Sequence, residues 1–317
     1  MTAIFKEKEL CEQGIKILEQ SGGKTVYHIS CREGSAKMIS FKVFDGIELV
    51  YNDFHTSDCF QIAEYQPNIM EINYCRRGRF ECELKRNSYV YLGEGDVAVN
   101  MLDNQTDCQR FPLAVYKGIT ILIDVPTAQK ALSQVLDGVD VDLHALREKL
   151  CSHNRCMVFK APIAIEHIFQ EIYTVDARIQ IGYLRLKILE LFLILSVLTL
   201  PDNLETSRYF SAEQVQKVKH IKKRLTESLN KNITLNELAI EYRISLTALK
   251  DCFKAIYGKT IYAFRREYRM HAAAKMLNDT SFSIAEIGGL VGYENPGKFS
   301  ASFKEIMGVS PGEYRKK

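Results

Sequence analysis

Phe253-Lys254-Ala255-Ile256-Tyr257-Gly258-Lys259-Thr260 recurs fifty residues later as Phe303-Lys304-Glu305-Ile306-Met307-Gly308-Val309-Ser310. The two copies share apolar, basic and glycine positions in the same order. The match extends forward to Phe264-Arg265 against Tyr314-Arg315, and backward to Leu249 against Phe299. This agreement indicates an internal repeat, so we expect one structural unit to occur twice in the C-terminal third of the chain.

Each copy is preceded by a pattern that starts helices. Thr234 with Glu237, and Ser283 with Glu286, have the spacing of a capping box. In that motif the hydroxyl accepts a backbone N–H of the first helical turn, and the glutamate accepts the N–H of the capping residue. The predicted helices cover residues 235–241 and 284–291.

A tight turn follows each of these short helices, and a second helix follows the turn. Ser245 and Asn295 are favourable caps for the second helices, and Pro296 stands at the first helical position, where its missing N–H costs little. The order helix, turn, helix therefore predicts two helix-turn-helix units in tandem, the architecture that places each second helix in a major groove of DNA.

An apolar stripe along each second helix predicts which side is buried. The stripes are Leu249, Phe253 and Ile256 in the first unit, and Phe299, Phe303 and Ile306 in the second. The opposite sides hold lysines, which can donate to guanine or to phosphate, and an aspartate, which can accept from cytosine. With one arginine from the helix predicted between the units, at 261–277, the residues that we expect to contact DNA are Ser245, Thr247, Ala248, Lys250, Asp251, Lys254, Arg265, Asn295, Gly297, Lys298, Ser300, Ala301 and Lys304.

The two copies differ in their exposed chemistry. Gly297 and Ala301 offer little that can read a base, whereas Thr247, Lys250 and Asp251 can. We therefore expect the first unit to supply more base-specific contacts, and the second to act mainly through the DNA backbone and groove shape. The simpler alternative is that these lysines form an ordinary solvated helix face.

The net charge of +3 hides an uneven distribution. Residues 208–317 hold 20 Lys and Arg against 11 Asp and Glu, a balance of +9, which leaves 22 against 28, or −6, for the rest of the chain. This asymmetry predicts a polyanion-binding domain joined to a domain that does not bind polyanions.

Residues 211–317 resemble the DNA-binding domain of the AraC/XylS family of transcription regulators, and residues 284–315 are similar to its signature. Leu249-Lys250, Phe253-Lys254, Arg265 and Glu267-Tyr268-Arg269-Met270 are similar to the branch that includes siderophore-responsive regulators. Three positions depart from the family pattern, because Arg243 replaces the usual glycine of a turn, and Asp251 and Ala301 stand where arginine is common. An arginine in a left-handed turn would cost about 1 kcal/mol, so the expected fold is unaffected and the operator sequence stays open.

The chain before residue 201 has a β pattern followed by a helical one. After a short helix predicted at 11–20, segments rich in β-branched and aromatic residues alternate with turns. The predicted strands cover residues 25–30, 38–44, 47–52, 60–65, 69–75, 79–85, 88–92, 97–101 and 118–125, with turns at 77–78 and 93–96. Their spacing predicts a small antiparallel barrel or jelly roll over residues 25–125.

Four helices are then predicted, over residues 127–136, 142–151, 162–175 and 181–200, before a polar linker at 201–210. The last of these helices is apolar nearly all round, so it should pack against a second helix, in the same subunit or across a dimer. The predicted fold class is α+β, with a sensor and dimerisation domain at 1–200 and an all-α DNA-binding domain at 211–317. The family resemblance implies the same order, with a cupin-like barrel followed by dimerising helices.

We expect no catalytic residue, metal or cofactor in the N-terminal domain. A metal cupin needs clustered histidines, but no histidine lies between His55 and His144. Cys151, His153 and Cys156 form one Cys/His cluster, whose spacing matches no standard zinc site and favours a structural role over metal or thiol sensing. Four aromatic residues, Tyr74, Phe80, Tyr89 and Tyr91, could line a ligand-binding barrel interior or simply fill its core.

Several features indicate a cytoplasmic protein. The N-terminus lacks the pattern of a signal peptide, and the apolar run at 188–200 is shorter than the roughly 20 residues that span a bilayer. The nine cysteines include no Cys-x-x-Cys pair, which favours reduced thiols.

We interpret the chain as a transcription regulator that binds double-stranded DNA, forms a homodimer, works with RNA polymerase, and senses a small-molecule effector without membrane contact. Two alternatives remain open. One is a regulator that binds no ligand or is controlled by a partner protein. The other is a cupin-type enzyme fused to a DNA-binding domain.

Overall fold

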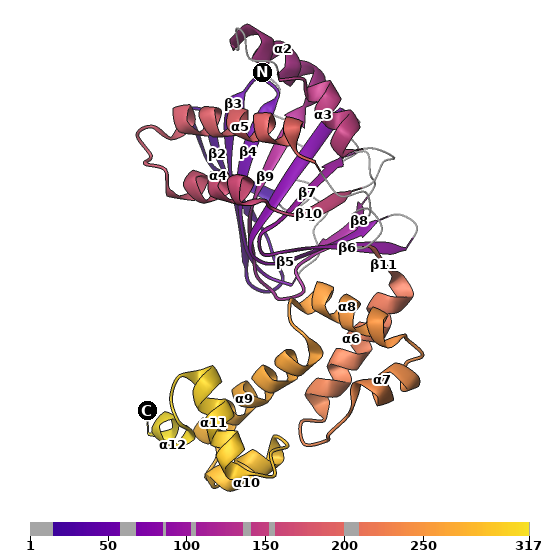
Figure 1. Ribbon diagram of the computed structural model, residues 1–317. Helices are drawn as coiled ribbons and strands as arrows, with labels where there is room; N and C mark the ends of the chain where they lie inside the picture. Colours follow the sequence, from indigo (N-terminus) through magenta and orange to yellow (C-terminus); the bar gives the residue numbers. More distant parts are fainter. Residues whose placement is uncertain are drawn as a thin grey trace. The chain divides into compact units, whose positions relative to one another are not determined.

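The computed structural model describes residues 15–57, 68–84, 87–102, 106–135, 141–151, 156–199 and 209–316, with only the backbone described at 106–108. The chain forms two compact units, Met1–Phe210 and Ser211–Lys317 (Figure 1). The first unit combines an antiparallel sheet with helices, and the second is helical.

The sheet of the first unit runs in the order β1-β2-β3-β4-β9-β5-β6-β11, while β7 and β8 also pair with β5, and β10 pairs with β7. The strands are β1 (Ile15–Ser21), β2 (Lys24–Ile29), β3 (Ser35–Phe44), β4 (Ile47–His55), β5 (Ile69–Leu84), β6 (Ser88–Gly93), β7 (Asp96–Met101), β8 (Thr106–Arg110), β9 (Tyr116–Asp124), β10 (Met157–Lys160) and β11 (Tyr209–Ser211). The long strand β5 organises this sheet, because it pairs with β6, β7, β8 and β9.

The four helices predicted for the first unit are present: α2 (Val125–Val135), α3 (Leu143–Leu150), α4 (Ile163–Thr174) and α5 (Gln180–Val197). The second unit consists of α6 (Ala212–Glu227), α7 (Leu235–Glu241), α8 (Leu246–Tyr257), α9 (Ile261–Asp279), α10 (Ile284–Leu290), α11 (Pro296–Met307) and α12 (Pro311–Arg315). Both predicted helix-turn-helix pairs, α7–α8 and α10–α11, are therefore formed.

Two predictions for the sheet were wrong. Residues 15–20 belong to strand β1 rather than to a helix, since Ile15 and Ile17 alternate along a hairpin closed by Gly22 and Gly23 at positive φ. Residues 77–78 do not end a strand, because β5 continues through a bulge between Cys75 and Arg77, after which Gly78 still pairs with Tyr116 of β9. Gly78 has φ 90°, and a Cβ there would lie 2.0 Å from the Val115 carbonyl oxygen, so glycine serves a close strand approach.

Two other predictions are limited by the description of the chain. The strand expected at 60–65 lies outside the described residues. Most of the expected linker, residues 201–208, also lies outside them, but Tyr209 and Phe210 belong to β11, which pairs with β6. The strand thus continues to Ser211, where α6 is capped.

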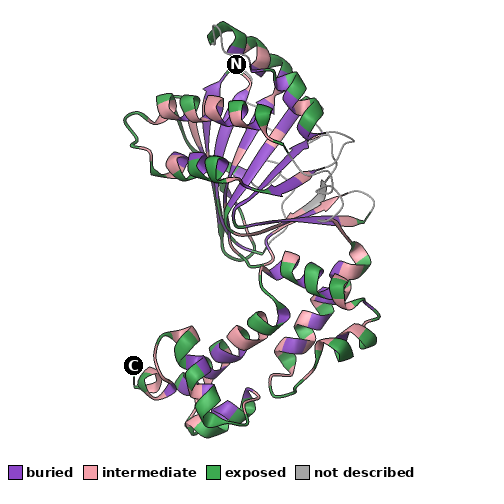
Figure 2. Cartoon of the chain, viewed as in Figure 1, coloured by how far each residue is buried: buried purple, intermediate pink, exposed green. Residues whose placement is uncertain are grey.

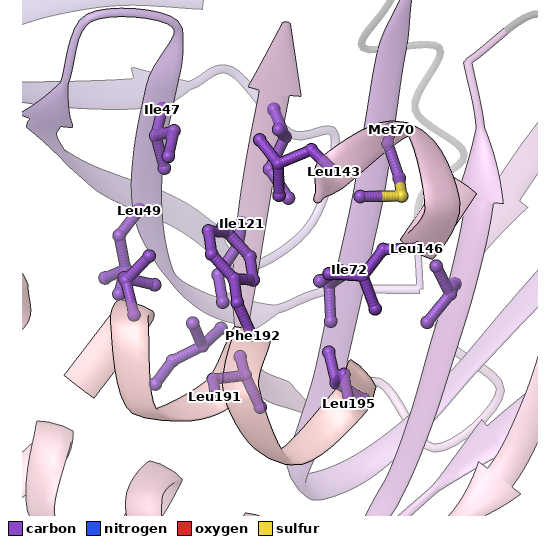
Figure 3. Close-up of a cluster of buried hydrophobic side chains, with 14 of the residues drawn as sticks. Ile47, Leu49, Met70, Ile72, Ile121, Leu143, Leu146, Leu191, Phe192 and Leu195 are labelled. Carbon is purple, nitrogen blue, oxygen red and sulfur yellow. The ribbon is translucent and has the colours of Figure 1, made fainter. Parts of the chain in front are cut away.

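The two faces of the sheet bury two different cores. The sheet–helix core joins strands β4, β5 and β9 to α3 and α5, and Figure 3 shows Ile47, Leu49, Met70, Ile72 and Ile121 facing Leu143, Leu146, Leu191, Phe192 and Leu195. The inner core draws its buried residues from the strands and their connections, with members such as Tyr27, Val50, Phe54, Cys82, Val90, Phe111 and Leu122. Because strands β1 to β7, β9 and β10 all contribute to the inner core, the sheet must curve around it.

Helix α5 is buried on one side only. Leu184, Ile188, Leu191, Phe192 and Leu195 are inaccessible to solvent, which satisfies the predicted packing within the subunit. A second set on or beside α5 is exposed (Figure 2), and we call it the α5 stripe: Ile179, Leu186, Leu193 and Val197. Among the described helices, none is both long enough and apolar enough to cross a membrane.

Replacing Phe192 by alanine tests the sheet–helix core. This side chain is fully buried in the core, so Phe192→Ala should lower the free energy of unfolding of the first unit by about 3–5 kcal/mol. The exposed Ser196 on the same helix is the matched control, and Ser196→Ala should change stability by no more than about 0.5 kcal/mol. Denaturant titration measures both, and equal losses would contradict this assignment of faces.

Candidate nucleic-acid interface

Helices α7 and α10 begin with the predicted capping boxes. The Thr234 hydroxyl accepts the Glu237 N–H at 3.2 Å, and the Glu237 carboxylate accepts the Thr234 N–H at 2.7 Å. Ser283 and Glu286 make the same two bonds at 3.2 and 2.7 Å. Hydrogen bonds from the backbone, then from the hydroxyl, lower the pKa of both glutamates. The two helix-turn-helix units therefore begin with the same pair of capping hydrogen bonds.

Helices α8 and α11 also begin and end alike. Ser245 Oγ accepts the Ala248 N–H at 3.2 Å, and Asn295 Oδ1 accepts the Lys298 N–H at 3.0 Å. Both helices end at a glycine with positive φ, 76° at Gly258 and 80° at Gly308. A residue without Cβ adopts this left-handed conformation without a steric penalty, which explains the glycine in each repeat.

The predicted apolar stripes orient both helices. Leu249, Phe253, Phe299 and Phe303 are fully buried, as is Ile256, while Ile306 is half-buried. The exposed set is Ser245, Thr247, Lys250, Asp251, Lys254, Asn295, Gly297, Lys298, Ala301 and Lys304, and Ala248 and Ser300 are half-buried. Ten of these twelve residues are therefore exposed, as the stripes predict, and their contact with DNA stays a prediction.

Four exposed lysines on the two second helices, Lys250, Lys254, Lys298 and Lys304, form what we call the interface lysines. Within the described part of the chain, none of them forms an ion pair, whereas other cations of the same unit do. Unit 2 holds 19 Lys and Arg against 11 Asp and Glu, a balance of +8. These lysines can therefore neutralise an external anion without first breaking an internal ion pair.

The arginines of α9 turn inward and hold the unit together. Arg266 Nε donates to Ser302 Oγ at 2.8 Å, and its Nη1 donates to Glu305 at 3.0 Å, which ties α9 to α11. Arg265 and Arg269 donate instead to backbone carbonyls of the loop before α7, at 3.1 and 3.3 Å. Burial, and then the charge of Arg269, lower the pKa of Arg265. Arg265, expected at the DNA surface, is half-buried, and its observed hydrogen bond lies within the domain.

The turns of the two units are built differently. Arg243 has φ 49°, and Gly292, at the equivalent position, has φ 81°. The N–H groups of both residues bond to the carbonyl three residues earlier, at 3.2 and 3.0 Å. A Cβ at Gly292 would lie 2.7 Å from the Leu229 backbone carbonyl oxygen and 2.5 Å from Arg269 Nη2. Because the backbone cannot move aside as a side chain can, the second turn requires glycine for space as well as for conformation.

Comparison with known proteins agrees with this geometry. A family model described as a helix-turn-helix domain matches residues 238–317. A putative AraC-like transcription regulator of Streptomyces antibioticus is 34% identical over 83 residues, which cover 26% of this chain and 27% of that protein. The C-terminal domain of this chain is thus similar to the DNA-binding part of AraC-like transcription regulators.

Two further similarities cover the same domain. The uncharacterized HTH-type transcriptional regulator YisR of Bacillus subtilis is 32% identical over 92 residues, or 29% of this chain and 32% of that protein. The solved C-terminal domain of AraT, a response regulator from Geobacillus stearothermophilus, is 31% identical with a TM-score of 0.31, and the match covers 32% of this chain and 84% of that one. The matches to the two curated relatives thus span about a third or less of those proteins' own length.

The ligand candidates in the first unit of the chain are not brought together. Tyr74 stacks on Phe169 in the sheet–helix core, with ring centroids 4.3 Å apart. The hydroxyls of Tyr89 and Tyr91 donate to Glu83 at 2.5 Å and to Glu81 at 2.8 Å. Of the four, Phe80 lines a cavity beside the inner core.

That cavity has polar lining residues that sequence reasoning missed. They are Asn52, Glu71, Asn73, Gln109 and Thr120, alongside apolar groups such as Phe54, Tyr116 and Leu122. A signal was present, because Glu71 and Asn73 are polar at alternate positions of residues 69–75, the otherwise apolar first half of β5, and alternate residues share one face.

The Cys/His cluster is only partly described. Cys151 and Cys156 are buried thiols, while His153 lies outside the described residues. Across the ranges that the structure describes, no group of three or more His, Cys, Asp or Glu is arranged to hold a metal ion.

The second turn of the helix-turn-helix domain is tested by a pair of glycine substitutions. Gly292→Ala should destabilise the second unit by about 1–2 kcal/mol from the left-handed backbone alone, with a further loss from contact with Arg269. Gly289 is the control, because a Cβ there meets nothing within 4 Å. Gly289→Ala lies inside α10 and should therefore raise the free energy of unfolding by up to about 1 kcal/mol. Urea denaturation of the full chain measures both changes, and equal effects would contradict the packing described for Gly292.

Proposed function

We propose that the protein is a sequence-specific, DNA-binding transcription regulator. The observation that carries this proposal is the pair of repeated helix-turn-helix units, whose second helices expose four lysines without ion pairs in the described structure. Similarity of the C-terminal domain to AraC-like regulators supports it, and the relatives named above are transcription regulators by description. In this proposal the protein has no enzymatic activity. It regulates transcription together with RNA polymerase, in the cytoplasm.

In this proposal α8 and α11 enter successive major grooves on one side of B-DNA, about 34 Å apart. Lys250 and Asp251 on α8 offer a donor and an acceptor that can distinguish base edges. Gly297 and Ala301 on α11 offer neither, so Lys298 and Lys304 would contact mainly phosphates. Specificity for the base sequence would then come chiefly from the first helix-turn-helix unit, α7–α8, and affinity for DNA from both helix-turn-helix units.

The first unit would act as a cupin-like sensor that also forms the homodimer. The α5 stripe supports the dimer, since Ile179, Leu186, Leu193 and Val197 repeat at intervals of seven, seven and four residues on one side of a helix. The cavity beside the inner core supports the sensor. An effector would regulate transcription by favouring one arrangement of the two DNA-binding units in the dimer over another.

Lysine substitutions test DNA binding. With sites selected by the full chain from random DNA, Lys250→Ala with Lys254→Ala should weaken binding at least about tenfold and lower the slope of log affinity against log salt by about 1.8 if both contact phosphate. Lys298→Ala with Lys304→Ala should weaken all sequences alike. The matched control is Lys223→Ala with Lys259→Ala, which removes two paired lysines of the same unit.

Titrations by fluorescence anisotropy at several salt concentrations measure these effects. The control should keep the affinity and slope of the wild type, because its lysines lie outside α8 and α11. If both α8 and α11 variants bound like the control, α8 and α11 would not be the contact helices.

A charge on the α5 stripe tests the dimer. Leu193→Asp changes an exposed side chain, so the fold should persist while the dimer dissociation constant rises roughly tenfold or more. Val135→Asp, an exposed apolar position on α2, is the control and should leave the dimer intact. Sedimentation velocity across a concentration series gives both constants, and an unaffected Leu193→Asp dimer would exclude this stripe from the interface.

A further inference from the structure

The cavity beside the inner core is lined by a group of polar side chains, which we call the polar wall, and by apolar side chains. It contains about 550 Å³ of space between its lining atoms, including the part open to solvent. The polar wall consists of Asn52, Glu71, Asn73 and Thr120 from β4, β5 and β9, and the apolar lining includes Phe54 and Phe80. Such a combination, an apolar surface with a few convergent polar groups, is typical of small-molecule sites.

Most of the polar wall satisfies its own hydrogen bonds. Asn52 Nδ2 donates to Thr120 Oγ1 at 2.9 Å, and Thr120 Oγ1 donates to Asn73 Oδ1 at 2.6 Å. This chain fixes the orientation of the three side chains across three neighbouring strands. The polar wall is therefore preorganised, and a ligand would not need to order it.

Glu71 is the member of this wall that lacks charge compensation. Its carboxylate accepts the Asn100 amide at 3.1 Å, from the residue directly opposite on β7. Within the described residues, no lysine, arginine or histidine forms an ion pair with it. Burial raises the pKa of Glu71, against the amides of Asn73 and Asn100, which favour the charged form. A carboxylate in such a place is stabilised most by a cation that reaches it from the cavity.

We propose that this cavity binds a small molecule with an apolar body and a protonated amine, and that the amine pairs with Glu71. The apolar body would cover Phe54 and Phe80, and the ammonium would donate to the carboxylate in a partly dehydrated setting, where charged hydrogen bonds are strong. An anionic ligand is disfavoured, because it would bring a second negative charge to Glu71. The description of this ligand as an effector rests on the proposed regulatory function, whereas its binding does not.

The same carboxylate is connected to the strand that leads into the second unit. Asn100, which donates to Glu71, also accepts from Cys156 Sγ at 3.8 Å. The Cys156 carbonyl accepts the Tyr209 hydroxyl at 2.5 Å, and Tyr209 opens β11. An ammonium on Glu71 competes with Asn100 for the carboxylate, so its presence is transmitted through Cys156 to Tyr209, three residues before α6 begins.

Ligand binding is tested without DNA, on the full chain, with matched probes. These are 2-phenylethylamine, 2-phenylethanol and phenylacetate, and n-butylamine, 1-butanol and butyrate. The amines should raise the melting temperature of the first unit in a saturable way, the alcohols should bind at least about tenfold more weakly, and the acids should not bind. Absence of binding by both amines, or equal binding by amines and alcohols, would overturn the proposal.

A matched pair of variants assigns the contact to Glu71. Glu71→Gln keeps the shape and should lower amine affinity about ten- to hundredfold. Glu81→Gln is the control, because Glu81 is a buried carboxylate of the same strand that accepts from Tyr91 and does not line the cavity. Amine binding by Glu71→Gln equal to that of Glu81→Gln would overturn the assignment, and the wild-type comparison of amines with alcohols decides the proposal even if a variant fails to fold.

The route to β11 is tested by Tyr209→Phe, which removes one hydroxyl. The variant should bind the amine like the wild type, but the amine should no longer change its affinity for a selected DNA site. An unchanged DNA response in Tyr209→Phe would overturn the route. DNA affinity measured without amine separates these results from a failure of the DNA-binding proposal itself.

Discussion

Burial of one apolar side of α8 and of α11 is the constraint on which the DNA-binding unit depends. Phe253 and Phe303 are completely enclosed, so neither helix can rotate about its axis without exposing a large aromatic ring. Because a helix with one side fixed has its other side fixed too, the same burial decides which residues face solvent. The orientation of the interface lysines is therefore a consequence of packing. The capping bonds and the two terminal glycines set where each helix starts and stops, and so which part of the outward side is available.

The arginines of α9 add the long-range part of this unit. Arg266 bridges to α11, while Arg265 and Arg269 hold the loop before α7. None of these contacts was predictable from the sequence, where the three residues look like an ordinary basic helix face. Caps, stripes and turns were predictable because they depend on residues three or four positions apart. Side chains whose partners lie more than thirty residues away have no comparable local signal.

The same division applies to the sheet. Long β-branched strands were recognised from alternation, but β10 and β11 were missed because each is only three or four residues long and exists through pairing with a distant strand. Gly78 was read as a turn, since a positive φ is common to turns and bulges, and only pairing with β9 distinguishes them. The aromatic residues chosen for a ligand site mostly fill cores or bond to glutamates. The polar residues at positions 71 and 73 were the better signal for a ligand site, because a polar side chain on a buried strand face costs free energy unless it has hydrogen-bond partners.

The contrast between Arg243 and Gly292 also bears on how the two halves of a duplicated domain can change over time. Any amino acid reached from glycine by one mutation brings a Cβ, and at position 292 that atom meets Arg269 and the Leu229 carbonyl. A tolerated replacement of Gly292 would require simultaneous replacements at neighbouring positions. Glycine should therefore rarely be replaced at this position during evolution. Position 243 already accommodates a long side chain at positive φ, and further replacements there would cost little more. The first helix-turn-helix unit is thus the half of the domain that is freer to change in sequence. It is also the half whose exposed side chains can distinguish one base sequence from another.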